Sequence, residues 1–184
     1  MLDDAELKLT WQAADAAGGA VGALVKLLML TGARRNEMME LARDEITADA
    51  MELPGERTKN GGPHSIFLTP LMRTVLDSCP ATGRYVLNGT DRPMGDHSSA
   101  KEKVAPAIRL WTLHDLRRSF ASGLQRLGVP PHIVELALNH RSGTFRGVAG
   151  IYQRHRYEKE VRDAFALWSR HIEGLTTEKA AAAA

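Results

Sequence analysis

The sequence has a single cysteine, Cys79, and no apolar run long enough to cross a membrane. One cysteine excludes a disulfide within the chain and fits a reducing cytoplasm, where we expect the protein to work. The longest apolar run, 21–30, is interrupted by Lys26 and falls short of the roughly 18 residues that a membrane span requires. The first residues also lack the basic-then-apolar order of a secretion signal. Neither a secreted disulfide scaffold nor a membrane protein is therefore expected.

Patterns that bind metals are missing as well. The seven histidines and the one cysteine are not spaced as paired ligands, and the carboxylates are not clustered as in a metal-dependent nuclease. We therefore expect neither a metal nor a cofactor.

The formal net charge of +2 is small, but Lys and Arg outnumber Asp and Glu between Arg109 and Arg162. A polyanion would consequently meet the protein in its C-terminal third.

Periodic apolar residues predict helices on both sides of a short strand-rich stretch. The clearest helix spans 113–127, where apolar residues recur at spacings of three and four before Gly128 ends it. A nearly all-apolar helix at 21–30 is predicted to lie in the core. The other predicted helices cover 3–17, 35–41, 70–78, 100–109, 130–139 and 148–172.

Three strand-like pieces, 51–53, 56–59 and 64–68, surround the turn-forming Asn60-Gly61-Gly62. They predict a small three-stranded antiparallel sheet packed beside a helical core. The fold class is then α+β and mostly helical, with one domain at 1–175. Residues 176–184 end in a run of alanines and are expected to form a disordered tail.

Two residues on the clearest helix suggest chemistry on a phosphodiester. His114 and Arg117 are three apart, so their side chains share a helix face. A guanidinium fork can bond two non-bridging phosphate oxygens while an imidazole exchanges a proton. Arg34 follows the buried helix at 21–30, and a second arginine on the same phosphate would stabilise a pentavalent transition state without a metal. Each of these residues alone would be an ordinary surface residue.

Lys59, His140 and Tyr152 complete the set of candidates. Lys59 lies at the edge of the predicted turn, from which it can reach a groove and give a proton to a leaving oxygen. A tyrosine phenol has a pKa of about 10 and needs cationic neighbours to become a nucleophile at neutral pH. Tyr157 competes with Tyr152 for this role. Glu37 and Asp115 are either partners that orient the neighbouring arginine and histidine or exposed charges.

Five segments resemble those of the tyrosine recombinases of the phage-integrase type. Residues 31–37 are similar to the segment with their first catalytic arginine, and 58–61 to their hairpin lysine segment. Residues 111–121 closely resemble their His-x-x-Arg block. Residues 138–140 match their Leu-x-His element, and 147–154 resemble the segment of the nucleophile. The five segments follow the order of the family, so the resemblance implies its catalytic domain.

The resemblance also implies a role for each candidate. Arg34 and Arg117 would clamp the scissile phosphate, and His140 would hydrogen-bond one of its oxygens. Lys59 would be the general acid for the 5′-hydroxyl, and His114 would assist as acid or base. Tyr152 would form a 3′-phosphotyrosyl bond.

Several expectations about assembly come from the same resemblance. The partner would be double-stranded DNA. The protein would form a homotetramer on DNA and could be a monomer when free in solution. We also expect the N-terminal core-binding and arm-binding domains of integrases to be absent from this chain, because the resemblance starts where their catalytic domain would begin. Two other functions stay open, a DNA-binding module without catalysis and a type IB topoisomerase, which shares the phosphotyrosyl chemistry.

Overall fold

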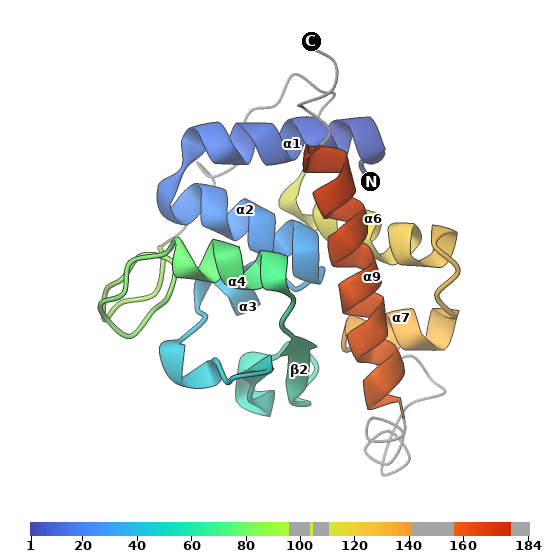
Figure 1. The fold of residues 1–184 in the computed structure, drawn as a ribbon. Helices are drawn as coiled ribbons and strands as arrows, with labels where there is room; N and C mark the ends of the chain where they lie inside the picture. The colour runs from blue at the N-terminus through green and yellow to red at the C-terminus, as the bar shows by residue number, and fades with distance from the viewer. Residues whose placement is uncertain (96–103, 105–110, 141–156, 178–184) are drawn as a thin grey trace.

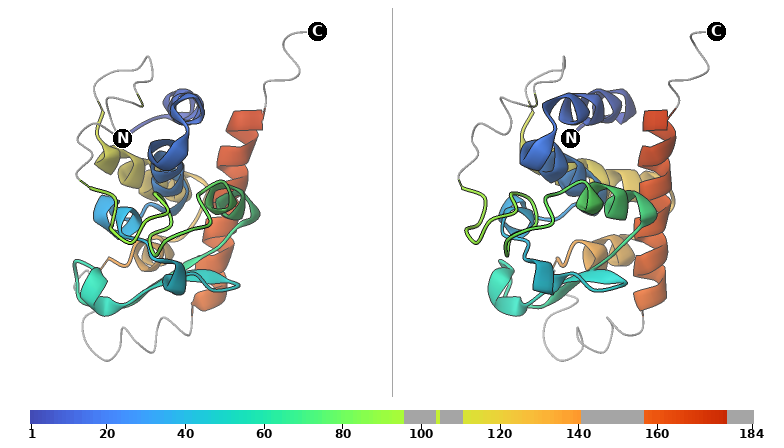
Figure 2. Two further views of the ribbon diagram at one scale, coloured as in Figure 1. Left: turned by 90° about the vertical axis from the view of Figure 1, so that its left-hand side faces the viewer. Right: turned by 60° about the vertical axis from the view of Figure 1, so that its left-hand side comes forward.

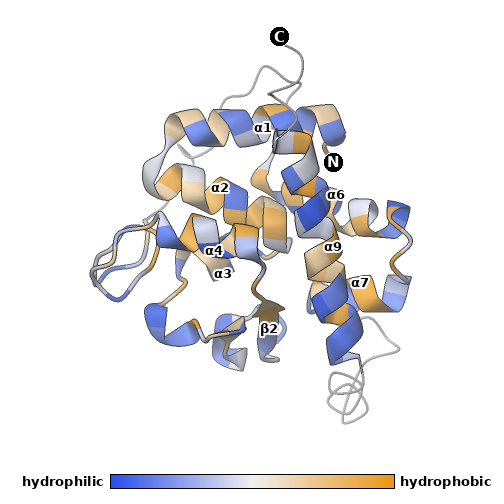
Figure 3. Ribbon diagram, in the orientation of Figure 1, coloured by the Kyte–Doolittle hydropathy of each residue, from blue (hydrophilic) through white to orange (hydrophobic). Residues whose placement is uncertain are grey.

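A computed structural model of the chain describes residues 1–95, 104, 111–140 and 157–177 (Figure 1). Its central element is α2 (Gly19–Thr31), in which nearly every residue from Val21 to Thr31 is buried. Figure 3 shows that α2 is largely hydrophobic, whereas α1 (Asp4–Ala17) and α9 (Glu158–Thr177) alternate hydrophobic and hydrophilic residues. The core helix predicted at 21–30 is thus confirmed.

Helix α1 begins at a capping box and packs on α2. The carboxylate of Asp3 accepts a hydrogen bond from the Glu6 backbone N–H, and the Glu6 carboxylate accepts one from the Asp3 backbone N–H, both at 2.9 Å. This reciprocal pair satisfies backbone donors that the first turn of a helix leaves free. Leu7, Trp11 and Ala14 form the buried face of α1, as predicted from their spacing.

The other described helices cover or extend this core. They are α3 (Arg35–Met39), α4 (Pro70–Asp77), α6 (Leu113–Arg126) and α7 (Pro131–Ala137), with a short 3₁₀ helix η1 (Arg43–Glu45). Each of the four α-helices lies where the sequence predicts one. Apart from residue 104, the helix predicted at 100–109 lies outside the described residues, as do 148–156 of the last predicted helix and 178–184 of the expected tail.

The sheet has two strands within the described residues, not the three that we predicted. Strands β1 (Ala50–Leu53) and β2 (His64–Phe67) pair antiparallel, with Met51 opposite Ile66. The piece 56–59 forms no strand, because Gly55–Arg57 is a 3₁₀ helix, η2. The Arg57 N–H bonds back to the Pro54 carbonyl at 3.0 Å, so this segment satisfies its backbone locally and not through a neighbouring strand.

Helix α9 stands along one side of the molecule, with the hairpin at one end of it (Figure 2). It contacts α1, α2, α6 and α7. Its buried Trp168 donates an indole hydrogen bond to the Met29 carbonyl in α2 at 2.8 Å. No helix in the described part of the chain is both long and apolar enough to span a bilayer.

Candidate active site

A pocket of about 800 Å³ opens between the end of α2, α3, the turn after η2 and the start of α6. Four of the six candidates predicted from the sequence line it, namely Arg34, Lys59, His114 and Arg117. They come from three separate parts of the chain, so the fold brings them together. Acidic residues also line the pocket, among them Glu40 and Glu56.

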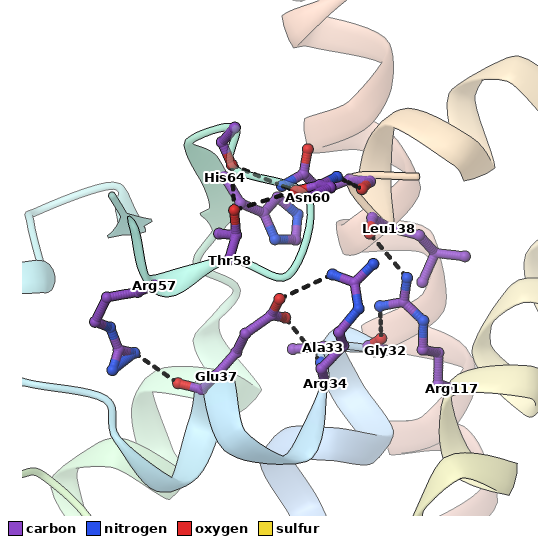
Figure 4. A network of polar contacts seen from close by, with 12 residues as sticks. Gly32, Ala33, Arg34, Glu37, Arg57, Thr58, Asn60, His64, Arg117 and Leu138 are labelled. Atoms are coloured by element: carbon purple, nitrogen blue, oxygen red, sulfur yellow. Dashed lines mark hydrogen bonds and ion pairs between the residues drawn. The ribbon is translucent and has the colours of Figure 1, made fainter. Parts of the chain in front are cut away.

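Arg117 is the most buried of the four, with 6% of its surface exposed. Its Nη1 donates to the Gly32 carbonyl at 2.8 Å and its Nη2 to the Leu138 carbonyl at 3.0 Å (Figure 4). These carbonyls lie at the C-terminal ends of α2 and α7, where the helix dipole favours a cation. Burial and the neighbouring Arg34 charge lower the pKa of Arg117 to about 10, so it stays protonated at neutral pH.

Gly32 ends α2 in a conformation that lets its carbonyl reach this guanidinium. Its φ is 61°, in the left-handed region where a side chain is disfavoured. A Cβ at this position would also lie 2.6 Å from the Phe120 ring, which packs directly against the turn. The glycine therefore serves both the backbone conformation and the close packing of α2 on α6.

Arg34 is oriented by Glu37. The Arg34 Nη1 lies 2.8 Å from Glu37 Oε1, and the Arg34 backbone N–H donates to Glu37 Oε2 at 2.9 Å. Glu37 is only 3% exposed, so the pair is held on a buried carboxylate. Of the two alternatives for Glu37, the structure supports the orienting partner. Arg34 is thus fixed beside Arg117 before a ligand binds.

His114 lies on the exposed first turn of α6. Its pKa is lowered by partial burial and then by the positive charges of Arg117, Arg118 and Arg34. The imidazole is therefore biased toward its neutral form, which can accept a proton.

Asp115 is a capping residue of α6, because its Oδ2 accepts from both the Thr112 N–H and the Thr112 hydroxyl at 2.9 Å.

The remaining candidates lie differently with respect to the pocket. Lys59 is exposed on the turn between η2 and β2, at the pocket rim. His140 is exposed, three residues after the end of α7, and is not one of the described residues that line the pocket. Tyr152 falls outside the described residues.

Sequence reasoning missed Arg57, which braces the site. Its Nη2 donates to the Glu37 carbonyl at 2.8 Å, and its Nε lies 2.7 Å from Glu45 Oε1. These contacts tie η2, and with it the Lys59 turn, to α3. No local pattern marked Arg57, because its partners come from other elements. Among the described residues, no group of three His, Cys, Asp or Glu side chains is placed to hold a metal ion.

Comparison with known proteins adds a family and a fold. The sequence model described as the phage integrase family matches residues 2–159. No curated protein matches the sequence. Two solved structures share the fold. One is a lambda integrase (75–356) dimer bound to a COC′ core site, with a TM-score of 0.61 and 20% identity over 79% of this chain and 59% of that chain.

The second structure is the XerH site-specific recombinase bound to its difH substrate in a pre-cleavage complex. It has a TM-score of 0.58 and 19% identity, and the match covers 87% of this chain and 53% of that chain. Both likenesses confirm the predicted fold class. The chain spans little more than half the length of either structure, so both are longer than the part that matches.

Proposed function

This chain belongs to the phage integrase family, and on that premise we propose that it is a catalytic domain that breaks and rejoins strands of double-stranded DNA through a 3′-phosphotyrosyl bond. The observation that carries the proposal is the meeting of Arg34 and Arg117 in one pocket. The charge of Arg34 lowers the pKa of Arg117, although burial has the larger effect. An anion between the two guanidinium groups would relieve their repulsion.

The two arginines suit the transition state of phosphoryl transfer. Each planar fork bonds non-bridging oxygens, and the pentavalent transition state carries more negative charge on those oxygens than the substrate does. Arg34 and Arg117 are already fixed by Glu37 and by two backbone carbonyls, so little reorganisation is needed on binding. His140 adds a hydrogen bond to one phosphate oxygen.

Cleavage then proceeds with balanced proton transfers. The phenolic oxygen of Tyr152 bonds to phosphorus as the bond to the 5′-oxygen breaks. The phenolic proton passes to neutral His114, and Lys59 gives a proton to the leaving 5′-oxygen. The phosphotyrosyl ester keeps the energy of the broken linkage, so a 5′-hydroxyl of another strand reverses the reaction without ATP or a divalent ion.

Recombination between two duplexes requires several active sites. We infer a homotetramer on DNA, with a monomer as the form free of DNA. The neighbouring structures, an integrase dimer on a core site and a recombinase on its substrate, support DNA as the partner. Further DNA-binding domains would supply site recognition.

The test is formation of a protein–DNA adduct. The full chain is incubated with a pool of nicked duplexes of randomised sequence, and adducts that survive denaturant are recovered and sequenced to define the cleavage site. A nick beside that site lets the short 5′-hydroxyl fragment leave, which traps the covalent form. We expect the unsubstituted chain to form the adduct and Tyr152→Phe to abolish it.

Tyr157→Phe is the matched control. The Tyr157 ring packs edge-on to His132, 5.2 Å between centroids, in a separate apolar pocket beside α9. This variant should keep full adduct formation. If Tyr157→Phe abolished the adduct and Tyr152→Phe did not, Tyr157 would be the nucleophile. If the unsubstituted chain bound DNA but formed no adduct, it would be a DNA-binding module without catalysis. Relaxation of plasmids at no defined site would indicate a topoisomerase.

A further inference from the structure

The turn that carries Lys59 is held together by its own side chains. Thr58 is buried, and its hydroxyl lies 2.7 Å from the Gly62 carbonyl oxygen and 3.1 Å from Asn60 Oδ1. The Gly61 N–H closes the turn by donating to the Thr58 carbonyl at 3.1 Å. The side chain of Lys59 therefore projects from a braced turn and not from a loose loop.

Two asparagines, Asn60 and Asn139, join this turn to the end of α7; Figure 4 labels Asn60 of the pair. Asn60 Nδ2 donates to the Asn139 carbonyl oxygen. In return, Asn139 Nδ2 donates to the Gly62 carbonyl at 3.0 Å and lies 3.3 Å from Asn60 Oδ1. Asn139 is 3% exposed and has a φ of 49°, a left-handed conformation that asparagine tolerates better than most residues. We call this reciprocal pair the asparagine bridge.

The same end of α7 also holds the buried arginine. The Leu138 carbonyl accepts from Arg117 Nη2 at 3.0 Å, and the Ala137 carbonyl lies 2.9 Å from His64 Nε2. Three consecutive carbonyls thus bond to Arg117, to Asn60 and to the first residue of β2. The end of α7 is a common support for the phosphate-binding guanidinium and for the lysine turn.

From this arrangement we propose that Asn60 and Asn139 are positioning residues that set the place of the Lys59 ammonium relative to the phosphate held by Arg117. The inference rests on the proposed function, in which Lys59 protonates the leaving 5′-oxygen. Proton transfer requires the ammonium within hydrogen-bond distance of that oxygen as its bond to phosphorus breaks. Fixing the residue next to Lys59 reduces the volume that its flexible side chain samples.

The bridge is needed for one proton transfer and not for the attack on phosphorus. In cleavage, Tyr152 oxygen bonds to phosphorus, the bond to the 5′-oxygen breaks, and the proton of Lys59 Nζ goes to that oxygen. If sulfur replaces the 5′-oxygen, the leaving group departs as a thiolate, because a thiol such as that of cysteine has a pKa of about 8.5. Such a substrate does not need the lysine proton.

The test compares single-turnover cleavage by the full chain and by Asn60→Ala. The substrates are nicked duplexes of the selected site with oxygen or sulfur at the scissile 5′ position. We expect Asn60→Ala to slow the oxygen substrate by about tenfold to a hundredfold, as for a small misplacement of a reacting group. The sulfur substrate should be cleaved at nearly the unsubstituted rate. Lys59→Ala should show the same pattern, whereas Arg117→Ala should slow both substrates.

Asn139→Gly is a second variant, because glycine tolerates the positive φ while the whole side chain, with its amide, is removed. The matched control is Asn88→Ala, which removes an amide that donates to the Arg92 carbonyl at 3.0 Å in a surface loop, and both its rates should stay unchanged. Thermal unfolding of each variant checks its folding. Equal slowing of both substrates by the bridge variants, or no slowing, would overturn the positioning role. A missing Tyr152-dependent adduct in the unsubstituted chain would overturn the proposed function instead.

Discussion

Arg117 carries a positive charge into the protein interior before any ligand arrives. A buried cation is tolerated only when it is bonded, and here the bonds come from the carbonyls of Gly32 and Leu138. The same residue therefore joins the ends of α2 and α7 and presents its guanidinium to the pocket. Its loss would affect both stability and chemistry.

Replacing Arg117 with alanine should remove most cleavage activity while much of the DNA affinity remains, because other Lys and Arg would still contact the backbone. The two freed carbonyls should each cost about 1–3 kcal/mol of unfolding free energy if they stay buried without partners. Adduct formation, duplex binding and thermal unfolding measure the three effects.

Arg73→Ala is the control for this prediction, because Arg73 is exposed on α4 and lies outside the pocket lining. We expect its cleavage activity and melting temperature to match those of the unsubstituted chain. A fall in binding as large as the fall in cleavage for Arg117→Ala would contradict a role in the transition state.

Among the elements, α6 holds its position through close contact with α9. A Cβ at Gly123 would lie 2.1 Å from the Trp168 ring, so α6 meets α9 where only a glycine fits. Trp168 is in turn bonded to α2 through the Met29 carbonyl. Because α6 carries His114 and Arg117, this packing sets the position of one wall of the pocket.

Gly123→Ala should destabilise the protein, because the added methyl group forces the Trp168 ring or the α6 backbone to move. Overpacking of this kind costs about 1–3 kcal/mol, which corresponds to a fall in melting temperature of roughly 2–4 °C per kcal/mol for a chain of this size. Thermal unfolding followed by circular dichroism measures the shift.

Gly174→Ala supplies the opposite case in α9. Its added Cβ would meet no atom within 4 Å, so the substitution should raise the melting temperature through better helix propensity. If Gly123→Ala also raised the melting temperature, the close contact between α6 and α9 would not limit the packing.

For the whole molecule, the formal charge of +2 is too small to make long-range attraction to DNA the main source of affinity. Basic side chains instead gather locally, with Arg34, Arg35, Lys59 and Arg117 lining one pocket. Binding is therefore expected to depend on which cation is removed and not on the total charge.

Two substitutions that each remove one positive charge test this expectation. Arg35→Ala removes an exposed cation of the pocket, and Arg73→Ala removes an exposed cation of α4, outside the pocket lining. With a random-sequence duplex, Arg35→Ala should lower the affinity and reduce the slope of log K against log salt by about one. Arg73→Ala should leave both unchanged. Equal effects, measured by fluorescence anisotropy across a salt series, would show that the total charge governs binding.

The helices were predictable because their signals are local. Caps such as Asp3, the three-and-four spacing from Leu113 onward, and the breaks at Gly32 and Gly128 act within a few residues of where they stand. The absence of a third strand at 56–59 was not predictable in the same way. The composition of 56–59 suits a strand, but a strand also needs a partner in register, and the backbone of η2 bonds to itself.

By itself the sequence determined the helical framework, the family resemblance and the residue types needed to hold a phosphodiester. Only the tertiary structure decided which side chains meet, because Arg34, Lys59 and Arg117 lie far apart along the chain. Arg34 and Arg117 converge because α3 and α6 pack on α2, and the Lys59 turn joins them through its bonds to α3 and to the end of α7. The bracing by Arg57 and the bridge between Asn60 and Asn139 also depend on that packing. Their bonds join backbone carbonyls and side chains of different elements, and no local pattern encodes such a meeting.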